Sequence, residues 1–204
     1  MSVELEEQRP KIKPIKKRKS DDTKSDFRFV RVPSNRKSIL KKNWKDICDP
    51  IINQLKLQIR MNLAKGQIEI RKSPDTEIET ALQKAYEFLK AFLSGFEVKD
   101  ALAILRVDDI FIDSFMVTDV RKLPRGHLSR AIGRIVGKKG KTKFTIENAT
   151  QTRIVVADQH IHLLGSFKNI RVAKATIVRL IVGSQPGKVY SQMQMVAARN
   201  KCRY

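Results

Sequence analysis

The chain has 204 residues, and its 42 Lys and Arg against 21 Asp and Glu give a formal net charge of +21. That length leaves room for one or two small domains. Cys48 and Cys202 lie far apart, so we expect no disulfide framework and a reducing compartment. The sequence shows neither a secretory signal nor an apolar run long enough to span a bilayer, so we expect neither a secreted nor a membrane protein.

The charge is unevenly distributed along the chain. The net charge is +8 over residues 1–42, −3 over 43–120 and +16 over 121–204, where only Glu147 and Asp158 offset 18 cations. A segment with so few acidic residues is expected to bind a polyanion, and a generic basic surface is the weaker alternative. Its cations are spread over predicted strands and loops rather than one amphipathic helix, which disfavours a membrane surface. The mildly acidic middle indicates scaffold or a protein-binding surface.

Residues 1–26 lack aromatic side chains and carry a dense basic cluster over residues 10–19. Low hydrophobicity with dense charge predicts a disordered basic tail. The cluster is typical of a nuclear localisation signal or a nucleic-acid contact, and a purely solubilising role is the alternative.

Residues 27–107 show the patterns of a small unit of mixed helices and strands. Thr76 is a candidate N-cap of its longest helix, and Gly95 lies near the end of that helix. The expected elements are a strand over Phe27–Val32, a helix over Lys42–Gln54 that Pro50 kinks or restarts, a hairpin of Leu57–Leu63 and Gln67–Arg71, a helix over Thr76–Phe96 and a short joining helix over Glu97–Leu105.

Residues 108–183 predict a second such unit. Its expected elements are a strand within Asp108–Val117, an apolar helical stretch ending at Val136, a helix opening at Lys141, strands over Thr152–Ala157 and His160–Gly165, and a helix over Phe167–Val182. After Gly183 we expect a basic C-terminal tail, helical in its middle. Tyr190 and Tyr204 in this tail are available to stack on bases or to pack.

The four residues Gly137-Lys138-Lys139-Gly140 carry the functional signal of this second unit. Glycines remove the Cβ atoms that would hold a sugar-phosphate away from the backbone. The two lysines supply positive charge, and the helix that opens next points free N–H groups at a phosphate. A GxxG loop of this kind clamps about four nucleotides in KH domains. A Walker A loop is disfavoured, because Ile135 stands where that motif requires glycine.

The order helix, GxxG, helix, strand, strand, helix is that of a KH domain, and the first unit repeats a similar order without the GxxG. We therefore predict an α+β protein of two tandem type I KH domains, the first degenerate. The expected divisions are a tail at 1–26, a degenerate KH-like domain with a linker helix at 27–107, a KH domain at 108–183 and a basic tail at 184–204.

No catalytic constellation is apparent in the sequence. His160 and His162 would point the same way on a strand, but no third ligand has metal-site spacing. Asp108, Asp109 and Asp113 are better explained by capping and solvation than by a magnesium cluster. We therefore expect a binding protein that is not an enzyme and uses no metal or cofactor.

From Phe27 onward the chain resembles the eukaryotic Partner-of-Nob family, also called the Dim-two type of small-subunit ribosome assembly factor. Four stretches carry the resemblance, and generic KH domains do not share them. They are residues 100–109 (DALAILRVDD), 127–136 (HLSRAIGRIV), 140–148 (GKTKFTIEN) and 188–190 (KVY).

The resemblance implies a role in late maturation of the small ribosomal subunit. It implies binding to pre-rRNA near the 3′ end of 18S rRNA in pre-40S particles. It also implies as partners the Nob endonuclease, the rRNA adenine dimethyltransferase, other assembly factors and ribosomal proteins, without a membrane. The corresponding location is the nucleus and nucleolus, with cytoplasmic passage on pre-40S particles. A KH-domain regulator of mRNA is the alternative.

By position, the resemblance also implies three kinds of RNA contact. The backbone clamp is Gly137, Lys138, Lys139 and Gly140; the floor of a base-binding groove is Ile135, Val136, Ile146 and Ile154; the rim cations are Arg134, Lys141, Lys143 and Arg153. In one departure from the family pattern, Lys139 stands where a small residue, often glycine, is expected. In another, Lys143 occupies a position that many KH helices give to an apolar residue, with Phe144 expected to pack in its place.

Overall fold

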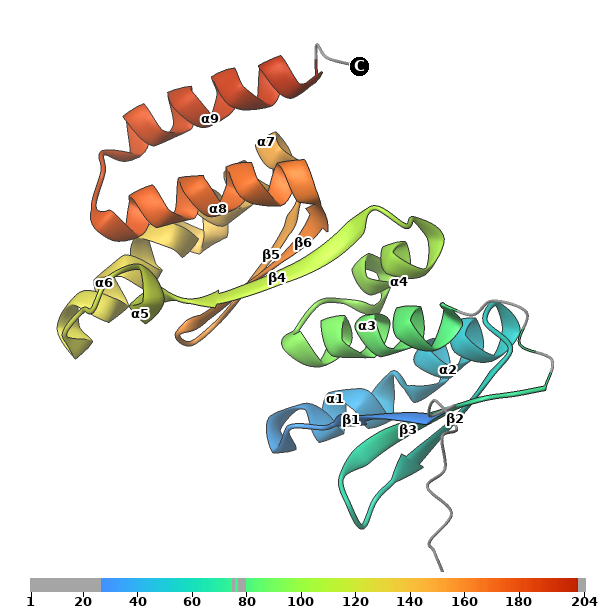
Figure 1. The fold of residues 1–204 in the computed structure, drawn as a ribbon. Helices are drawn as coiled ribbons and strands as arrows, with labels where there is room; N and C mark the ends of the chain where they lie inside the picture. The colour runs from blue at the N-terminus through green and yellow to red at the C-terminus, as the bar shows by residue number, and fades with distance from the viewer. Residues whose placement is uncertain (1–26, 75, 77–79, 202–204) are drawn as a thin grey trace, which may run out of the picture.

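The computed structural model describes residues 27–74, 76 and 80–201, which form two halves joined by a helix (Figure 1). The expected N-terminal tail, Cys202 and Tyr204 lie outside these residues. The first half comprises β1 (Phe27–Arg31), η1 (Ser34–Arg36), α1 (Lys37–Lys42), α2 (Trp44–Asn53), β2 (Leu57–Asn62), β3 (Gln67–Lys72) and α3 (Ala81–Ser94).

Helix α4 (Val98–Arg106) leads into the second half. This half comprises β4 (Ile110–Met116), α5 (Val117–Val120), α6 (Arg125–Val136), η2 (Lys138–Gly140), α7 (Lys141–Thr150), β5 (Arg153–Ala157), β6 (His160–Ser166), α8 (Phe167–Val182) and α9 (Pro186–Lys201).

The two halves share one topology. Each has a three-stranded antiparallel sheet with its third strand in the centre, in the orders β1-β3-β2 and β4-β6-β5. Helices cover one face of each sheet (Figure 1). The predicted α+β fold of type I KH domains is thereby confirmed.

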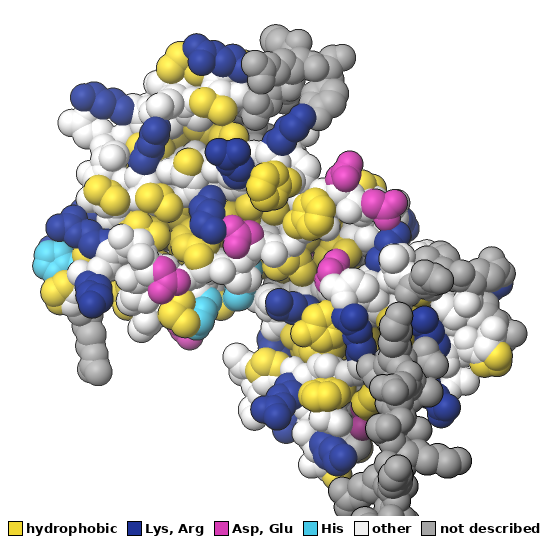
Figure 2. Space-filling view, viewed as in Figure 1, with side chains coloured by type: hydrophobic (Ala, Val, Ile, Leu, Met, Phe, Trp, Pro, Cys, Tyr) yellow, Lys and Arg dark blue, Asp and Glu magenta, His cyan; other side chains and the backbone are white. Residues whose placement is uncertain are grey.

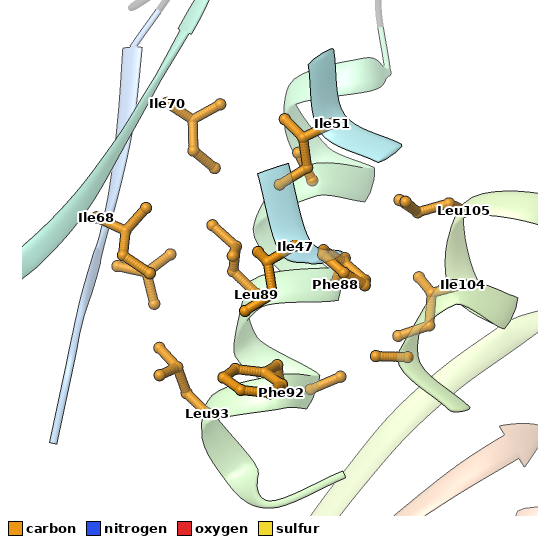
Figure 3. Close-up of a cluster of buried hydrophobic side chains, with 14 of the residues drawn as sticks. Ile47, Ile51, Ile68, Ile70, Phe88, Leu89, Phe92, Leu93, Ile104 and Leu105 are labelled. Atoms are coloured by element: carbon orange, nitrogen blue, oxygen red, sulfur yellow. The ribbon is translucent and has the colours of Figure 1, made fainter. Parts of the chain in front are cut away.

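Alternating apolar residues on the strands and one apolar stripe on each helix build a core in each half. Figure 3 shows part of the first core, where Phe88 and Phe92 of α3 lie among isoleucines of α2 and β3. Ile104 and Leu105 of α4 are buried in the same cluster, so the helix that joins the halves is part of the first core.

The halves contact each other through one face of the second sheet, to which β4, β5 and β6 all contribute. Leu164 belongs to the first core and Val155 packs against it. Gly95, at φ +118°, lies under Val155, because a Cβ at this glycine would be 2.8 Å from Val155 Cγ1. Arg153 and Asp100 add an ion pair across the same boundary, with Nε and Oδ1 3.1 Å apart. The contact thus combines apolar packing with an ion pair.

Helix α3 begins later than the sequence predicts. Thr76 is not its N-cap, because the Thr76 hydroxyl donates to the Lys56 carbonyl at 2.9 Å and accepts the Ser73 N–H at 3.1 Å. The threonine thus closes the loop after β3, and the helix starts at Ala81. The helix expected over 42–54 is present as α2 and continues through Pro50, and α1 is an additional helix before it that the sequence did not predict.

The C-terminal segment is more ordered than the expected tail. Helix α9 covers residues 186–201 and lies along α8 (Figure 1). Val189 and Met193 of α9 are buried, and Tyr190 packs against the second core. Of the two roles open to Tyr190, the structure therefore supports packing.

Glu69 on β3 gives a pH-dependent contribution to the stability of the first half. Its buried carboxylate accepts hydrogen bonds from Asn62, Gln67 and Arg60, at 3.0, 3.0 and 2.5 Å. These bonds, the one from Asn62 foremost, lower the pKa of Glu69 to about 2. A carboxyl with a lowered folded-state pKa stabilises the fold above its unfolded pKa, and this stabilisation is lost as the pH falls toward the folded pKa.

We therefore expect Glu69→Gln to be less stable than the wild type at pH 7. The difference in unfolding free energy between the two proteins should decrease as the pH falls from about 4.5 to 2. Urea-unfolding midpoints of both proteins at several pH values measure this. An equal stability difference at pH 7 and pH 3 would contradict this expectation.

Candidate nucleic-acid interface

The loop between α6 and α7 turns sharply on residues with positive φ. Gly137 has φ 73° and ψ 179°, Lys139 has φ 54° and ψ 31°, and Gly140 has φ 75° and ψ 7°. The Gly137 conformation is essentially restricted to glycine. A Cβ there would also lie 2.2 Å from Thr142 Oγ1, so the loop backbone rests directly on the first turn of α7. Gly140 instead faces open space, with no atom within 4 Å of an added Cβ.

The start of α7 is built to attract an anion. Lys138, Lys139 and Lys141 are exposed around it, and the first turn of the helix holds no acidic residue. Cations at a helix N-terminus oppose the helix dipole, so this arrangement costs stability in the free protein. With a phosphate in place, the same cations and the free N–H groups of the first turn act together. The site therefore has the geometry and charge of a phosphate clamp.

The left-handed conformation of Lys139 explains why a glycine would suit this position. A side chain in the αL region costs roughly 1–2 kcal/mol, whereas glycine adopts it freely. Glycine also has more conformational entropy in the unfolded chain, and this offsets part of the stabilisation gained by removing the strain. We expect Lys139→Gly to raise the unfolding free energy by about 0.5–1 kcal/mol, measured by urea denaturation. A drop in stability would contradict the assigned strain.

The predicted groove floor lies mostly beneath the surface. Ile135, Ile146 and Ile154 are 0, 0 and 1% exposed and belong to the second core. Only Val136 among these four is half-buried. The three isoleucines therefore hold the helices and strand that carry the loop, and in this structure they offer no surface to a base.

Arg134 and Lys141 keep positions beside the loop. The Arg134 guanidinium lies over Gly183, the C-cap of α8, with Nη1 3.2 Å from where a Cβ would be. A cation there complements the carbonyl end of the helix. Arg134 thus links the clamp side of α6 to α8.

Lys143 and Arg153 have acidic partners. Lys143 Nζ lies 3.8 Å from Oε1 of Glu147, and that oxygen accepts the Ile154 N–H at 2.7 Å. Because Glu147 is buried, this bond fixes the start of β5 to α7. Arg153 pairs with Asp100 of α4. Lys143 and Arg153 are therefore less available to phosphates than the exposed lysines of the loop.

Phe144 corrects the expected packing of α7. Its side chain is 58% exposed, so it does not take the packing role suggested for it beside Lys143. An exposed aromatic ring one turn from the loop is a surface on which a base can stack. The sequence signal, an aromatic residue four positions after a GxxG, was compatible with either role.

The first half lacks the clamp at the equivalent place. Its helices α1 and α2 join at Asn43 alone, between Lys42 and Trp44, and Trp44 packs against the first core. No glycine pair opens the backbone between the two helices. This half keeps the fold without the loop, as predicted for a degenerate KH domain.

The histidines do not form a metal site within the described part of the chain. His160 and His162 stack with ring centroids 6.2 Å apart, and Ser114 Oγ lies 2.7 Å from His162 Nδ1. Burial, followed by the charges of His160 and Lys90, lowers the pKa of His162. Among the residues that the structure describes, no three His, Cys, Asp or Glu side chains gather as a metal would require. Within the same residues, no helix is both long and apolar enough to cross a bilayer.

Comparison with known proteins agrees with this geometry. The family model of the eukaryotic type KH domain (type I) matches residues 114–198, the part that holds the loop. RNA-binding protein pno1 of Dictyostelium discoideum is 56% identical over 88% of this chain and 75% of its own length. Pre-rRNA-processing protein PNO1 of Saccharomyces cerevisiae is 49% identical over 96% of this chain and 72% of its own.

A solved structure shares the fold of both halves. It is the complex of a/eIF2alpha, aDim2p and rRNA from Pyrococcus horikoshii, with a TM-score of 0.74 and 25% identity over 85% of this chain and 94% of that one. The identity to the eukaryotic relatives extends over both halves, beyond the region that the KH family model matches. This chain therefore belongs to the PNO1 family of KH-domain proteins.

Proposed function

We propose that this protein is an RNA-binding ribosome assembly factor that binds pre-rRNA near the 3′ end of 18S rRNA in pre-40S particles. The observation that carries the proposal is the loop at Gly137–Gly140, whose open Gly140 and exposed lysines surround the N-terminus of α7. The relatives' names, RNA-binding protein and pre-rRNA-processing protein, support it. So does the rRNA bound in the complex from Pyrococcus horikoshii.

In this function the two halves act differently. The second half, with its net charge of +16 over residues 121–204, holds the RNA. The mildly acidic stretch over residues 43–120 contacts proteins over part of its surface. The protein partners are the Nob endonuclease, the rRNA adenine dimethyltransferase and other pre-40S factors and ribosomal proteins. The chain positions RNA for these enzymes and is not itself one. It works in the nucleus and nucleolus and passes through the cytoplasm on pre-40S particles.

Sedimentation of the tagged protein from cell extracts tests this proposal. We expect it to migrate with pre-40S particles and to be released from them by Lys138→Asp/Lys139→Asp. An mRNA regulator would migrate with mRNA particles or as free protein. Either of those two patterns for the wild type would overturn the assembly role.

A further inference from the structure

The sheet of the first half has an open face that carries no aliphatic side chain. The strand register places three rows on it, because directly opposed residues of neighbouring strands point to the same face. The rows are Phe27–Arg71–Gln58, Phe29–Glu69–Arg60 and Arg31–Gln67–Asn62. The opposite face carries Val30, Ile68 and Ile70, which are buried under the helices. We call the nine residues of the three rows the open face.

Two aromatic rings on the open face are available to a ligand. Phe27 and Phe29 are 41 and 50% exposed, and their ring centroids are 6.4 Å apart. Both lie on β1, an edge strand of the sheet. Exposing two neighbouring phenylalanines costs free energy unless a ligand covers them.

Three arginines share the open face with these rings. Arg31, Arg60 and Arg71 are on the open face, and Glu69 is its single acidic residue. The Glu69 carboxylate is already held by Arg60, Asn62 and Gln67, so the face presents net positive charge. Figure 2 shows hydrophobic side chains lying among Lys and Arg side chains on this half of the molecule.

This combination fits RNA better than a protein partner. Aromatic rings on an open sheet stack on unpaired bases, and arginines beside them meet the phosphates. The amides of Gln58, Gln67 and Asn62 can hydrogen-bond base edges or sugars. Aromatic and arginine side chains also occur at protein interfaces, so it is the net positive charge of the face, three arginines against one glutamate, that favours a polyanion.

We infer that the open face is a second RNA-binding surface, on which bases of a single-stranded segment stack on Phe27 and Phe29. The phosphates of this RNA segment contact Arg31 and Arg71. The face belongs to the half without a GxxG loop and lies on its sheet, whereas the clamp of the second half lies between helices. The inference extends the proposed function and rests on it, because one RNA strand would then be held at two places on the chain.

Photocrosslinking tests this inference. RNA spanning the 18S 3′ end, with iodouridine in place of uridine, is bound to the full-length protein and irradiated, and the linked peptides are mapped by mass spectrometry. Iodouridine couples to aromatic rings stacked on it. We expect crosslinks at Phe27 or Phe29 in addition to those near the loop at Gly137–Gly140. Crosslinks confined to the loop region would overturn the inference and leave the proposed function standing.

Two matched variants separate stacking from apolar contact. Phe27→Leu/Phe29→Leu keeps apolar area without the rings, and we expect it to weaken binding of the same RNA by roughly tenfold per ring. Phe27→Tyr/Phe29→Tyr should bind as the wild type does. Phe111→Leu, which changes a phenylalanine 49% exposed on the edge strand β4, is the control and should have little effect.

The variants also distinguish the two sites. If Phe27→Leu/Phe29→Leu binds the RNA as tightly as the wild type does, the inference is overturned. If that variant keeps its RNA affinity but loses a protein that co-purifies with the wild type, the open face binds a protein partner. Lys138→Asp/Lys139→Asp should abolish the loop crosslinks and keep those at Phe27 and Phe29. If the wild type binds this RNA no better than a scrambled one, the proposed function fails, whatever the open face contacts.

Discussion

Gly137→Ala is expected to lower the unfolding free energy by about 3 kcal/mol and to abolish RNA binding by the loop. The new methyl group would meet Thr142 Oγ1, Thr142 Cβ and the Thr142 backbone nitrogen at 2.2, 2.8 and 3.0 Å. Side-chain rotation can move the hydroxyl, but the backbone nitrogen belongs to the first turn of α7. The φ of 73° and ψ of 179° add strain for any residue with a Cβ. Urea denaturation and RNA titration measure the two effects.

Gly140→Ala is the matched control in the same loop. Gly140 also has positive φ, but its added Cβ would meet nothing within 4 Å. Its stability cost should therefore be limited to the αL penalty of about 1 kcal/mol. Because that Cβ points into the space proposed for RNA, affinity should still fall. Equal destabilisation by the two variants would contradict the close packing of Gly137 on α7.

Lys138→Asp/Lys139→Asp is expected to weaken RNA binding by roughly 100-fold, since repulsion replaces two charge-assisted hydrogen bonds. Both side chains are exposed, so the fold should stay intact. The slope of log affinity against log salt should also become shallower, by about 0.7 for each phosphate of a single strand that the variant no longer neutralises. Fluorescence anisotropy at several salt concentrations measures both quantities.

The first half supplies a control of equal charge. Lys41 and Lys42 are exposed at the end of α1, the place that corresponds to the loop, but no GxxG follows them. Lys41→Asp/Lys42→Asp makes the same change in net charge. We expect it to lower affinity far less than the loop variant. Equal effects would mean that total charge, and not the clamp, governs binding.

The elements that the sequence predicted well are those fixed by local signals. Helix α8 has the predicted bounds of Phe167–Val182, because its apolar period is regular and Gly183 ends it. The start of α7 at Lys141 follows from the glycine that precedes it. The first hairpin follows from clean alternation around Gly66, and the second from the β-branched residues of its first strand.

Long-range interactions account for most of the differences. Thr76 was predicted to cap a helix, but a carbonyl twenty residues earlier uses its hydroxyl. The pairing of Arg153 with Asp100 joins residues 53 positions apart. Helix α9 forms throughout its length because Val189 and Met193 are buried against the second core. None of these partners can be identified from spacing along the chain.

The candidate site was predictable where it depends on the backbone and less so where it depends on burial. The loop at Gly137–Gly140 stands where its glycines indicated. Apolar residues beside such a loop can line a binding groove or belong to the core beneath the loop. Their spacing along the sequence is the same in both cases. Only the packed structure shows that Ile135 and Ile146 lie below the surface while Phe144 lies on it.

The most direct test of the central claim is the affinity of the purified protein for RNA spanning the 3′ cleavage site of 18S rRNA, compared with a scrambled RNA of equal length. We expect tighter binding to the cleavage-site RNA, and disappearance of that preference in Lys138→Asp/Lys139→Asp. Equal affinity for both RNAs, or an unchanged preference in the variant, would contradict the assignment of the loop as the pre-rRNA clamp.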